Sequence, residues 1–267
     1  MIRGAWLVLV ACCVASGGPG GDRARAADTE EAPARDRTEV RVAVAANLAT
    51  PFAAIAGSFE NSTGARLAVS AGATGALYAQ IRNGAPFDVF LAADTLHPQL
   101  LVESEDAVPG TRVTFAAGRL VLWSGDPGRI VGERVAALRS PDLHKLAIAN
   151  PKIAPYGRAA QETLTRLGLW EDLQPKLVYG ENVGQTLRFV ESGAAELGFI
   201  ALSQARDPRL AGRGSQWIVP AELHAPLLHD AVLLRAGKEN TAARALLEFL
   251  GGNETRAILE RFGYGLP

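Results

Sequence analysis

An apolar strand that runs straight into a helix start sets the pattern for this chain. Residues 42–45 (VAVA) are small and apolar, as in a strand buried on both faces. Thr50 is suited to capping the helix that follows, and Pro51 is tolerated at a first helical position, where its missing N–H group would have no partner. Apolar residues mark one face of this helix before a suitable stop at Gly64, namely Phe52, Ile55, Ala56 and Phe59. The free N–H groups at such a helix start suit an anion, although ordinary α/β domains contain the same geometry.

The same alternation of short apolar strands and amphipathic helices continues from Glu39 to the C-terminus. It predicts an α/β fold with mainly parallel sheets flanked by helices. Further strands are expected near residues 67–69, 88–92, 119–123, 146–149, 177–178, 197–201 and 231–234. Further helices are expected near residues 77–84, 96–101, 159–167 and 183–192, with two more inside 241–262.

An internal repeat with an offset of 109 residues connects the two halves of this pattern. Residues 70–75 (SAGATG) correspond to residues 179–184 (YGENVG), and the same offset pairs Phe90 with Phe199. It also pairs residues at four predicted helix starts, Asn47 with Tyr156 and Thr74 with Val183. The repeat therefore predicts two similar lobes with four helix N-termini that can face one cleft.

These four residues are the candidate anion-binding positions. Asn47 could donate its side-chain amide and Thr74 its hydroxyl, and all four could donate a backbone N–H. Each also has an ordinary structural explanation: capping or turn formation for Asn47 and Thr74, a turn with the ring packed over an edge for Tyr156, and the first apolar residue of a helix for Val183. Their regular placement favours the ligand site.

Composition limits the class of protein. The 267 residues allow one large domain or two small ones, and a net charge of −1 gives no electrostatic reason to expect nucleic-acid binding. Both cysteines, Cys12 and Cys13, precede the folded part. We therefore expect no disulfide, zinc–thiolate site or cysteine nucleophile there.

Residues 1–38 are interpreted as a signal peptide and flexible leader. Positive charge at residues 1–3 precedes an apolar run at 5–15 that is too short to span a bilayer. Two processing routes are open. Residues 24–26 (ARA) fit ordinary cleavage, with the leader removed after Ala26, whereas residues 9–12 (LVAC) fit a lipoprotein box that would anchor the protein through Cys12. We favour the soluble exported form.

Catalytic motifs are weak. The four histidines, His97, His144, His224 and His229, show no metal-ligand spacing, and the last two are expected on the surface. The glycine-rich run at residues 72–75 (GATG) is neither a nucleophile elbow nor a phosphate-binding loop. Carboxylates at Asp88, Asp94 and Glu196 could act as acids or bases, but capping and surface ion pairs are the commoner roles. We expect a binding protein rather than an enzyme.

Six stretches give the chain a family resemblance. They are residues 44–48 (VAANL), 83–94 (NGAPFDVFLAAD), 118–124 (GRLVLWS), 155–160 (PYGRAA), 181–183 (ENV) and 261–264 (RFGY). From Glu39 to the C-terminus the chain resembles the periplasmic molybdate-binding proteins, the solute receptors of molybdate/tungstate ABC importers. The resemblance implies a type II periplasmic-binding-protein fold, with residues 39–117 and 231–267 in lobe 1 and residues 118–230 in lobe 2. It implies a hinge near residues 116–118 and 228–231.

The resemblance also implies a ligand and partners. A molybdate or tungstate oxyanion would be held between the lobes by neutral donors at Asn47, Thr74, Tyr156 and Val183, with a further contact at Ala46. Molybdenum would be present only within the oxyanion, with no protein ligand and no cofactor. The expected partners are the permease subunits of an ABC importer, and the receptor would be a periplasmic monomer. Some relatives have a tyrosine where this chain has Ala201, which leaves the preference between molybdate and tungstate open. A receptor of the same fold for sulfate or another anion, and an enzyme on a related scaffold, are the alternatives.

Overall fold

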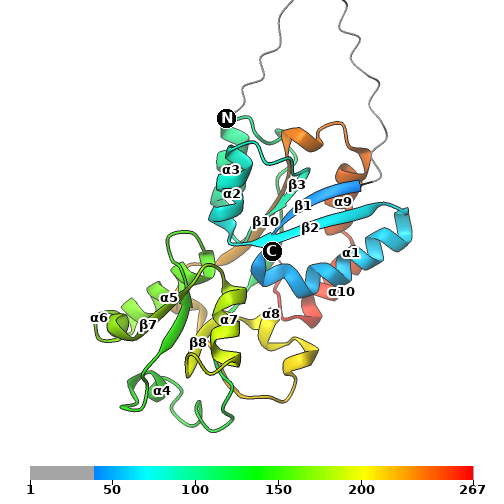
Figure 1. Ribbon diagram of the computed structural model, residues 1–267. Helices are drawn as coiled ribbons and strands as arrows, with labels where there is room; N and C mark the ends of the chain where they lie inside the picture. Colours follow the sequence, from blue (N-terminus) through cyan, green and yellow to red (C-terminus); the bar gives the residue numbers. More distant parts are fainter. Residues whose placement is uncertain (1–38, 267) are drawn as a thin grey trace, which may run out of the picture. The chain divides into compact units, whose positions relative to one another are not determined.

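A computed structural model describes residues 39–266, which form two five-stranded sheets with helices on their faces (Figure 1). The expectations for the leader, cleavage after Ala26 or lipidation at Cys12, lie outside the described residues. Among these residues, no helix is both long enough and apolar enough to cross a membrane.

The first sheet has the strand order β2-β1-β3-β10-β4. Strand β1 is parallel to β2 and β3, while β10 is antiparallel to both β3 and β4. Its strands are β1 (Glu39–Ala45), β2 (Arg66–Gly72), β3 (Val89–Leu91), β4 (Val113–Gly118) and β10 (Leu227–Leu233). The helices that follow them are α1 (Ala49–Thr63), α2 (Thr74–Arg82), α3 (Leu96–Glu103), α9 (Thr241–Leu250) and α10 (Asn253–Arg261), with short 3-10 turns at η1 (Ala46–Leu48) and η5 (Arg235–Gly237).

The second sheet repeats this arrangement with the order β7-β6-β8-β5-β9. Strand β6 is parallel to β7 and β8, and β5 is antiparallel to β8 and β9. Its strands are β5 (Leu120–Ser124), β6 (Leu146–Ala149), β7 (Leu177–Gly180), β8 (Leu197–Ala201) and β9 (Ser215–Ile218). Its helices are α4 (Ala136–Arg139), α5 (Pro155–Arg166), α6 (Trp170–Leu173), α7 (Val183–Glu191) and α8 (Leu202–Ala205), with 3-10 turns at η2 (Gln174–Lys176), η3 (Pro208–Leu210) and η4 (Ala221–Leu223).

The matching strand orders support the internal repeat and confirm an α/β architecture with two helix-flanked sheets. In each sheet the three strands of the repeat are parallel, and a single strand, β10 or β5, runs against its neighbours. Each sheet is therefore mixed, although four of its five strands share one direction.

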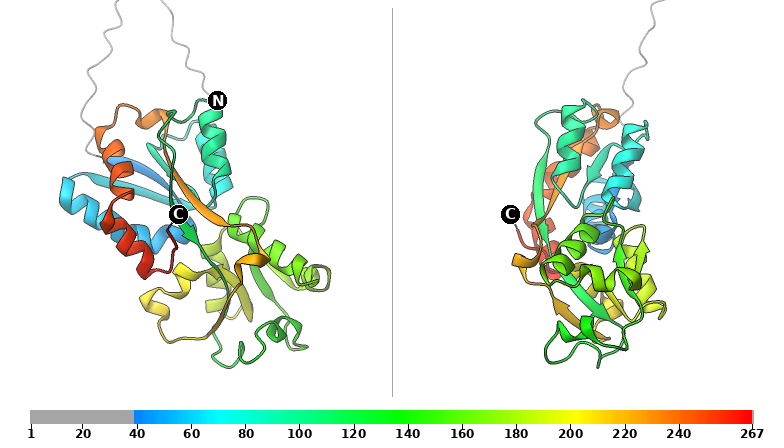
Figure 2. Two further views of the ribbon diagram at one scale, coloured as in Figure 1. Left: turned by 180° about the vertical axis from the view of Figure 1, so that it is seen from behind. Right: turned by 90° about the vertical axis from the view of Figure 1, so that its left-hand side faces the viewer.

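Alternation of side chains along β1 places apolar groups on both faces of the first sheet. One face packs against α1 and α9, where Phe59 and Phe249 meet edge to face with ring centroids 5.5 Å apart. The other face packs against α2 and α3 through residues such as Leu77 and Leu101. Figure 2 shows the same two groups of helices from behind and from the side.

Helix α1 ends as expected but does not begin as expected. Gly64 adopts the left-handed conformation (φ 73°), and its N–H donates to the Glu60 carbonyl. Thr50 does not cap the helix, because α1 begins one residue earlier at Ala49 without a side-chain cap. Instead the Thr50 hydroxyl donates to the Asp207 carboxylate, 3.0 Å away beside the second sheet.

Two segments connect the sheets. Arg119 alone separates β4 from β5, and residues 219–226 connect β9 to β10. The segment expected at residues 228–231 lies inside β10, where Leu228 pairs with Ala117 of β4. The two segments expected at the hinge, residues 116–118 and 228–231, therefore lie side by side, with His229 opposite Ala116. The lobe boundaries stay a prediction.

Gly118, the last residue of β4, makes room for two buried side chains. A Cβ atom there would overlap the Tyr156 hydroxyl and lie 2.8 Å from Cε1 of His229. We expect Gly118→Ala to cost about 1–3 kcal/mol of unfolding free energy through overpacking. The measurement is urea unfolding followed by circular dichroism.

Gly57 offers a matched control, because a Cβ atom there would meet nothing within 4 Å. It lies inside α1, so Gly57→Ala should raise stability by up to about 1 kcal/mol. Equal effects of the two substitutions would contradict the close packing at Gly118.

Candidate functional site

A small pocket lies where the strands end and four helical segments begin. Its empty volume is about 210 Å³. All five residues expected at the site (Ala46, Asn47, Thr74, Tyr156 and Val183) line it, together with Ala45, Gly72, Ala73, Ala93, Ala154, Pro155 and Asn182. Four segments far apart in the sequence, two from each half of the repeat, thus meet around one space.

The helical segments at this pocket begin with backbone N–H groups that have no side-chain cap, although the Gly75 N–H of α2 donates to the Ile153 carbonyl and Pro155 of α5 has no N–H. Helices α2 and α5 follow Ala73 and Ala154, which have no side chain able to cap them, and η1 also begins without a side-chain cap. In α7 the Asn182 side chain accepts only from the N–H of Gln185, 3.0 Å away. The first N–H groups of a helix have no acceptor within it. The pocket is therefore a place where unpaired N–H groups converge.

The electrostatics of the pocket are positive without a positive side chain. None of its lining residues carries a charge. Each helix N-terminus contributes a partial positive charge, and its N–H groups point along the axis toward a bound group. Such a pocket suits an anion whose oxygen atoms all accept hydrogen bonds. Because the 210 Å³ includes space open to solvent, the enclosed cavity is smaller still and lies far below the roughly 300–1,000 Å³ of pockets for drug-sized molecules, which favours a small ion.

Thr74 is arranged to donate. Its buried hydroxyl oxygen accepts from the N–H of Ala93 at 3.0 Å. This bond uses the oxygen and leaves the hydroxyl hydrogen for another acceptor. Since Thr74 lines the pocket and begins α2, it can offer both its N–H and its O–H group.

Asn47 is arranged differently from the sequence prediction. Its amide nitrogen lies 2.6 Å from Nε2 of His229 and 2.8 Å from the Tyr264 hydroxyl. The Nδ1 atom of His229 lies 2.9 Å from the Leu227 carbonyl, which can only accept, so Nδ1 carries the proton and Nε2 accepts from Asn47. Both amide hydrogens of Asn47 are then engaged inside the protein. The donor left for the pocket is its backbone N–H.

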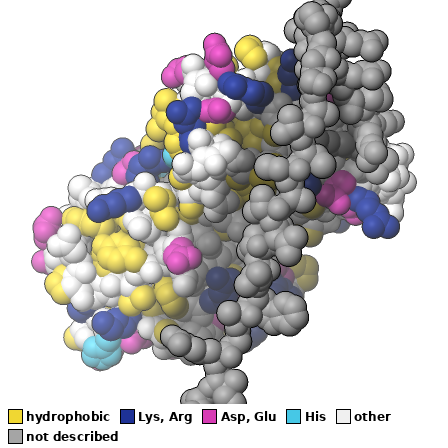
Figure 3. Space-filling view, turned by 45° about the horizontal axis from the view of Figure 1, so that its top comes forward, with side chains coloured by type: hydrophobic (Ala, Val, Ile, Leu, Met, Phe, Trp, Pro, Cys, Tyr) yellow, Lys and Arg dark blue, Asp and Glu magenta, His cyan; other side chains and the backbone are white. Residues whose placement is uncertain are grey.

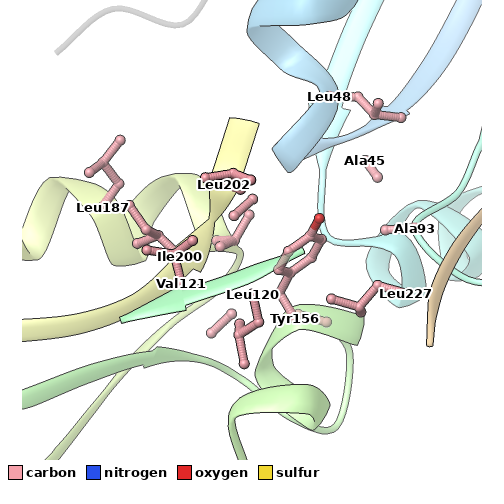
Figure 4. Close-up of a cluster of buried hydrophobic side chains, with 14 of the residues drawn as sticks. Ala45, Leu48, Ala93, Leu120, Val121, Tyr156, Leu187, Ile200, Leu202 and Leu227 are labelled. Carbon is pink, nitrogen blue, oxygen red and sulfur yellow. The ribbon is translucent and has the colours of Figure 1, made fainter. Parts of the chain in front are cut away.

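The ring of Tyr156 is buried rather than packed over an edge. It lies among apolar residues of both halves of the chain, including Leu120, Leu202 and Leu227 (Figure 4). Its hydroxyl lies 3.5 Å from the Asn47 amide nitrogen. Burial raises the pKa of Tyr156 well above its ordinary value, so the hydroxyl keeps its proton.

Sequence reasoning missed two buried residues behind the pocket. His229, expected on the surface, is fully buried in β10, and His224 is also buried. Tyr264 is buried next to His229, with ring centroids 5.4 Å apart. The signal for His229 was its place in the apolar strand LLHDAVL, and the signal for Tyr264 was its place in the RFGY stretch.

Further contacts hold the two halves together around the pocket. The Gly75 N–H donates to the Ile153 carbonyl at 2.8 Å, and Arg158 pairs with Asp94 at 3.2 Å. Burial would raise the pKa of Asp94, but the His97 hydrogen bond and the nearby Arg158 charge outweigh it and lower that pKa. Asp94 therefore stays charged and can hold the ion pair.

The carboxylates considered as acids or bases have structural roles. Asp88 accepts from the Arg41 N–H at 2.7 Å, and Glu196 accepts from the Lys145 N–H at 2.7 Å. Neither these two nor Asp94 lines the pocket. Within residues 39–266 there is also no group of three or more His, Cys, Asp or Glu side chains that could hold a metal ion. On the face shown in Figure 3, basic and acidic side chains are interspersed.

Comparison with known proteins fits this geometry. Residues 40–265 match the family described as bacterial extracellular solute-binding protein. The chain belongs to this family.

This solute-binding protein is 48% identical over 234 residues to the molybdate-binding protein ModA of Azotobacter vinelandii, covering 87% of this chain and 92% of the relative. It is 46% identical over 228 residues to ModA of Rhodobacter capsulatus, covering 85% and 88%. The solved periplasmic molybdate-binding protein of Azotobacter vinelandii is similar with a TM-score of 0.82 at 38% identity, covering 85% of this chain and 99% of that one. These likenesses confirm the type II periplasmic-binding-protein fold.

His229 gives this solute-binding protein a pH-dependent stability. Burial lowers the pKa of His229 from 6.5 to about 4, because the imidazolium ion would lose its hydration. Between these values the unfolded chain takes up a proton that the folded chain does not, so stability rises with pH. The difference corresponds to roughly 3 kcal/mol. Urea unfolding between pH 4 and about 6.5 measures it.

The variant His229→Gln isolates this contribution, since glutamine keeps an acceptor for Asn47 without titrating. Its stability should change less with pH over the same interval. Parallel curves for the two proteins would show that His229 is not held neutral by burial.

Proposed function

We propose that this protein captures molybdate or tungstate between its two lobes and delivers it to the permease of an ABC importer. The observation that carries the proposal is the meeting of four helical N-termini at one small pocket without charged side chains. Relatives that share nearly half of its residues are molybdate-binding proteins. The proposed contacts are Asn47, Thr74, Tyr156 and Val183, with Ala46 beside them.

The binding energy would come from many modest bonds. Hydrogen bonds to a charged group contribute roughly 1.5–3 kcal/mol each, so five to seven of them give on the order of 10–20 kcal/mol before the costs of desolvation and closure. Molybdenum would be carried as the centre of the oxyanion, with no bond to the protein. The protein itself therefore needs no cofactor.

Closure of the lobes would accompany capture. Asn47 and Thr74 belong to the first half of the repeat, and Tyr156 and Val183 to the second, so only a closed form brings all four donors to one ion. Motion about the segments at Arg119 and residues 219–226 would open the pocket. The ion then stabilises the closed form because it binds that form better.

This function agrees with the expected location. A receptor for an importer works outside the cytoplasmic membrane, and the solved relative is periplasmic. We propose a periplasmic monomer that exchanges its ion with permease subunits rather than an enzyme. The leader at residues 1–38 would direct export, with cleavage after Ala26 or anchoring at Cys12 as its two routes.

Selectivity should follow from an arrangement that offers donors only. Hydrogen phosphate carries an O–H group that needs an acceptor, and a shell of donors leaves that group unpaired. Sulfate has no such group but is smaller, so it should bind more weakly than molybdate. We expect thermal shifts in the order molybdate and tungstate, then sulfate, then phosphate.

The measurement is a thermal-shift panel on protein stripped of ligand, with chromate as a further tetrahedral dianion. Stabilisation by bound ligand grows with the ratio of ligand concentration to Kd, so equal concentrations rank the anions directly. Phosphate performing as well as molybdate would contradict the selectivity. A response to sulfate alone would support the alternative receptor.

Thr74 allows a direct test of one side-chain donor. Thr74→Val removes the hydroxyl and should weaken molybdate binding about ten- to hundredfold, because a bond to a charged ligand is lost. Thr74→Ser keeps the hydroxyl and should bind nearly as the native protein does. Isothermal titration calorimetry gives both values of Kd. An unchanged Kd in Thr74→Val would remove this hydroxyl from the site.

A further inference from the structure

A closed group of hydrogen bonds lies behind the pocket and joins the two lobes. We call it the Asn47 node, and it consists of the side chains of Asn47, Tyr156, Ser203, His229 and Tyr264. All five are buried. His229 lies on β10 of the first sheet, whereas Ser203 lies on α8 beside the second sheet. Of the five, only Asn47 and Tyr156 also line the pocket.

The surrounding groups assign the protons of His229 and of the Asn47 amide. The Leu227 carbonyl fixes the proton of His229 on Nδ1, so Nε2 accepts one amide hydrogen of Asn47. The second amide hydrogen goes to the Tyr264 hydroxyl, which lies 3.1 Å from the Ser203 hydroxyl and 3.0 Å from the Asn47 backbone carbonyl and can donate its one hydrogen to either. The Ser203 hydroxyl in turn donates to the backbone carbonyl of Asn47 at 2.8 Å. These bonds form a ring through Asn47, Tyr264 and Ser203.

The ring spans both sheets, so separation of the lobes would break it. Ser203 is the only member of the ring that lies beside the second sheet; its hydroxyl lies 3.1 Å from the Tyr264 hydroxyl and donates to the Asn47 backbone carbonyl. Hydrogen bonds in a buried chain polarise and strengthen one another. The orientation of the Asn47 amide therefore affects how well Ser203 docks.

The node also touches the connection between the sheets. Leu227, whose carbonyl orients His229, pairs with Gly118 at the end of β4. Arg119 follows at once and leads into β5. His229 thus lies in β10, near the connection through Arg119, and contacts Asn47 in η1.

We infer that His229 is a positioning residue for oxyanion capture: it holds the Asn47 amide so that Ser203 of the second lobe docks when the pocket closes. The inference rests on the proposed function and deepens it. His229 does not itself line the pocket. It acts through Asn47, which presents its backbone N–H to the ion and its backbone carbonyl to Ser203.

A double-mutant cycle on the Kd for molybdate tests this coupling. His229→Leu removes the acceptor of Asn47, and Ser203→Ala removes the bond from the second lobe. Each single variant should bind molybdate about tenfold more weakly, in line with the loss of one buried hydrogen bond. If His229 acts by orienting the groups that Ser203 contacts, the double variant should also bind molybdate only about tenfold more weakly than the native protein. Independent effects of the two substitutions would instead multiply to about a hundredfold.

Two further variants separate positioning from a general structural role. His229→Gln retains an acceptor and should restore most of the affinity. Ser192→Ala is the matched control for Ser203, because the Ser192 hydroxyl donates to a carbonyl within its own helix, that of Phe189. It should leave Kd unchanged. If His229→Leu does not fold, Tyr264→Phe replaces it in the cycle, since it removes the hydroxyl between Asn47 and Ser203.

The outcomes distinguish this inference from the proposed function. Native protein that binds no molybdate overturns both. Suppose instead that the native protein binds molybdate. The inference alone is then overturned if the affinity losses of the two single variants multiply in the double variant, or if Ser203→Ala leaves Kd unchanged as Ser192→Ala does. Calorimetry gives the Kd values, and stopped-flow dissociation should show the loss as faster release, because closure is what fails.

Discussion

The structure depends on a group of backbone N–H donors that the protein itself leaves without acceptors. A buried N–H group without a partner costs free energy, and helix starts normally avoid this with a side-chain cap. Here alanine precedes α2, α5 and η1, so no cap is available, and Asn182 reaches only the N–H of Gln185 in α7. In the proposed function, an oxyanion would supply the missing acceptors. The same lack of caps that weakens each helix start would then make the four together a binding site.

Side chains have a different task from the backbone. The hydroxyl hydrogen of Thr74 is available to the pocket, whereas both amide hydrogens of Asn47 are donated to His229 and Tyr264. The buried polar groups behind the pocket thereby fix the loop at η1 and meet Ser203 from the other lobe. Charged pairs such as Arg158 with Asp94 lie outside the pocket lining. In the proposed function, charged pairs would help to hold the lobes closed, and neutral groups would recognise the ion.

The sequence predicted the structural features that local patterns encode. Strand–helix alternation and the repeat indicated two sheets, and the same repeat picked out Asn47, Thr74, Tyr156 and Val183, which line one pocket. Long-range packing was not accessible in this way. A lone histidine in an apolar strand gives no sign of whether Asn47 will face it, and Thr50 has the chemistry of a cap but found Asp207 instead. The crossing segment expected at residues 228–231 lies in β10, which is longer than its apolar centre at residues 231–234 suggested.

The central claim is that backbone and hydroxyl donors alone hold the ion between the lobes. A crystal structure with molybdate, with data collected at the molybdenum absorption edge, tests it most directly. We expect one strong anomalous peak in the pocket between Asn47 and Val183, with N–H and O–H groups at about 2.7–3.2 Å from the oxygens. A peak elsewhere, or an arginine, lysine or carboxylate in contact with the oxyanion, would contradict it.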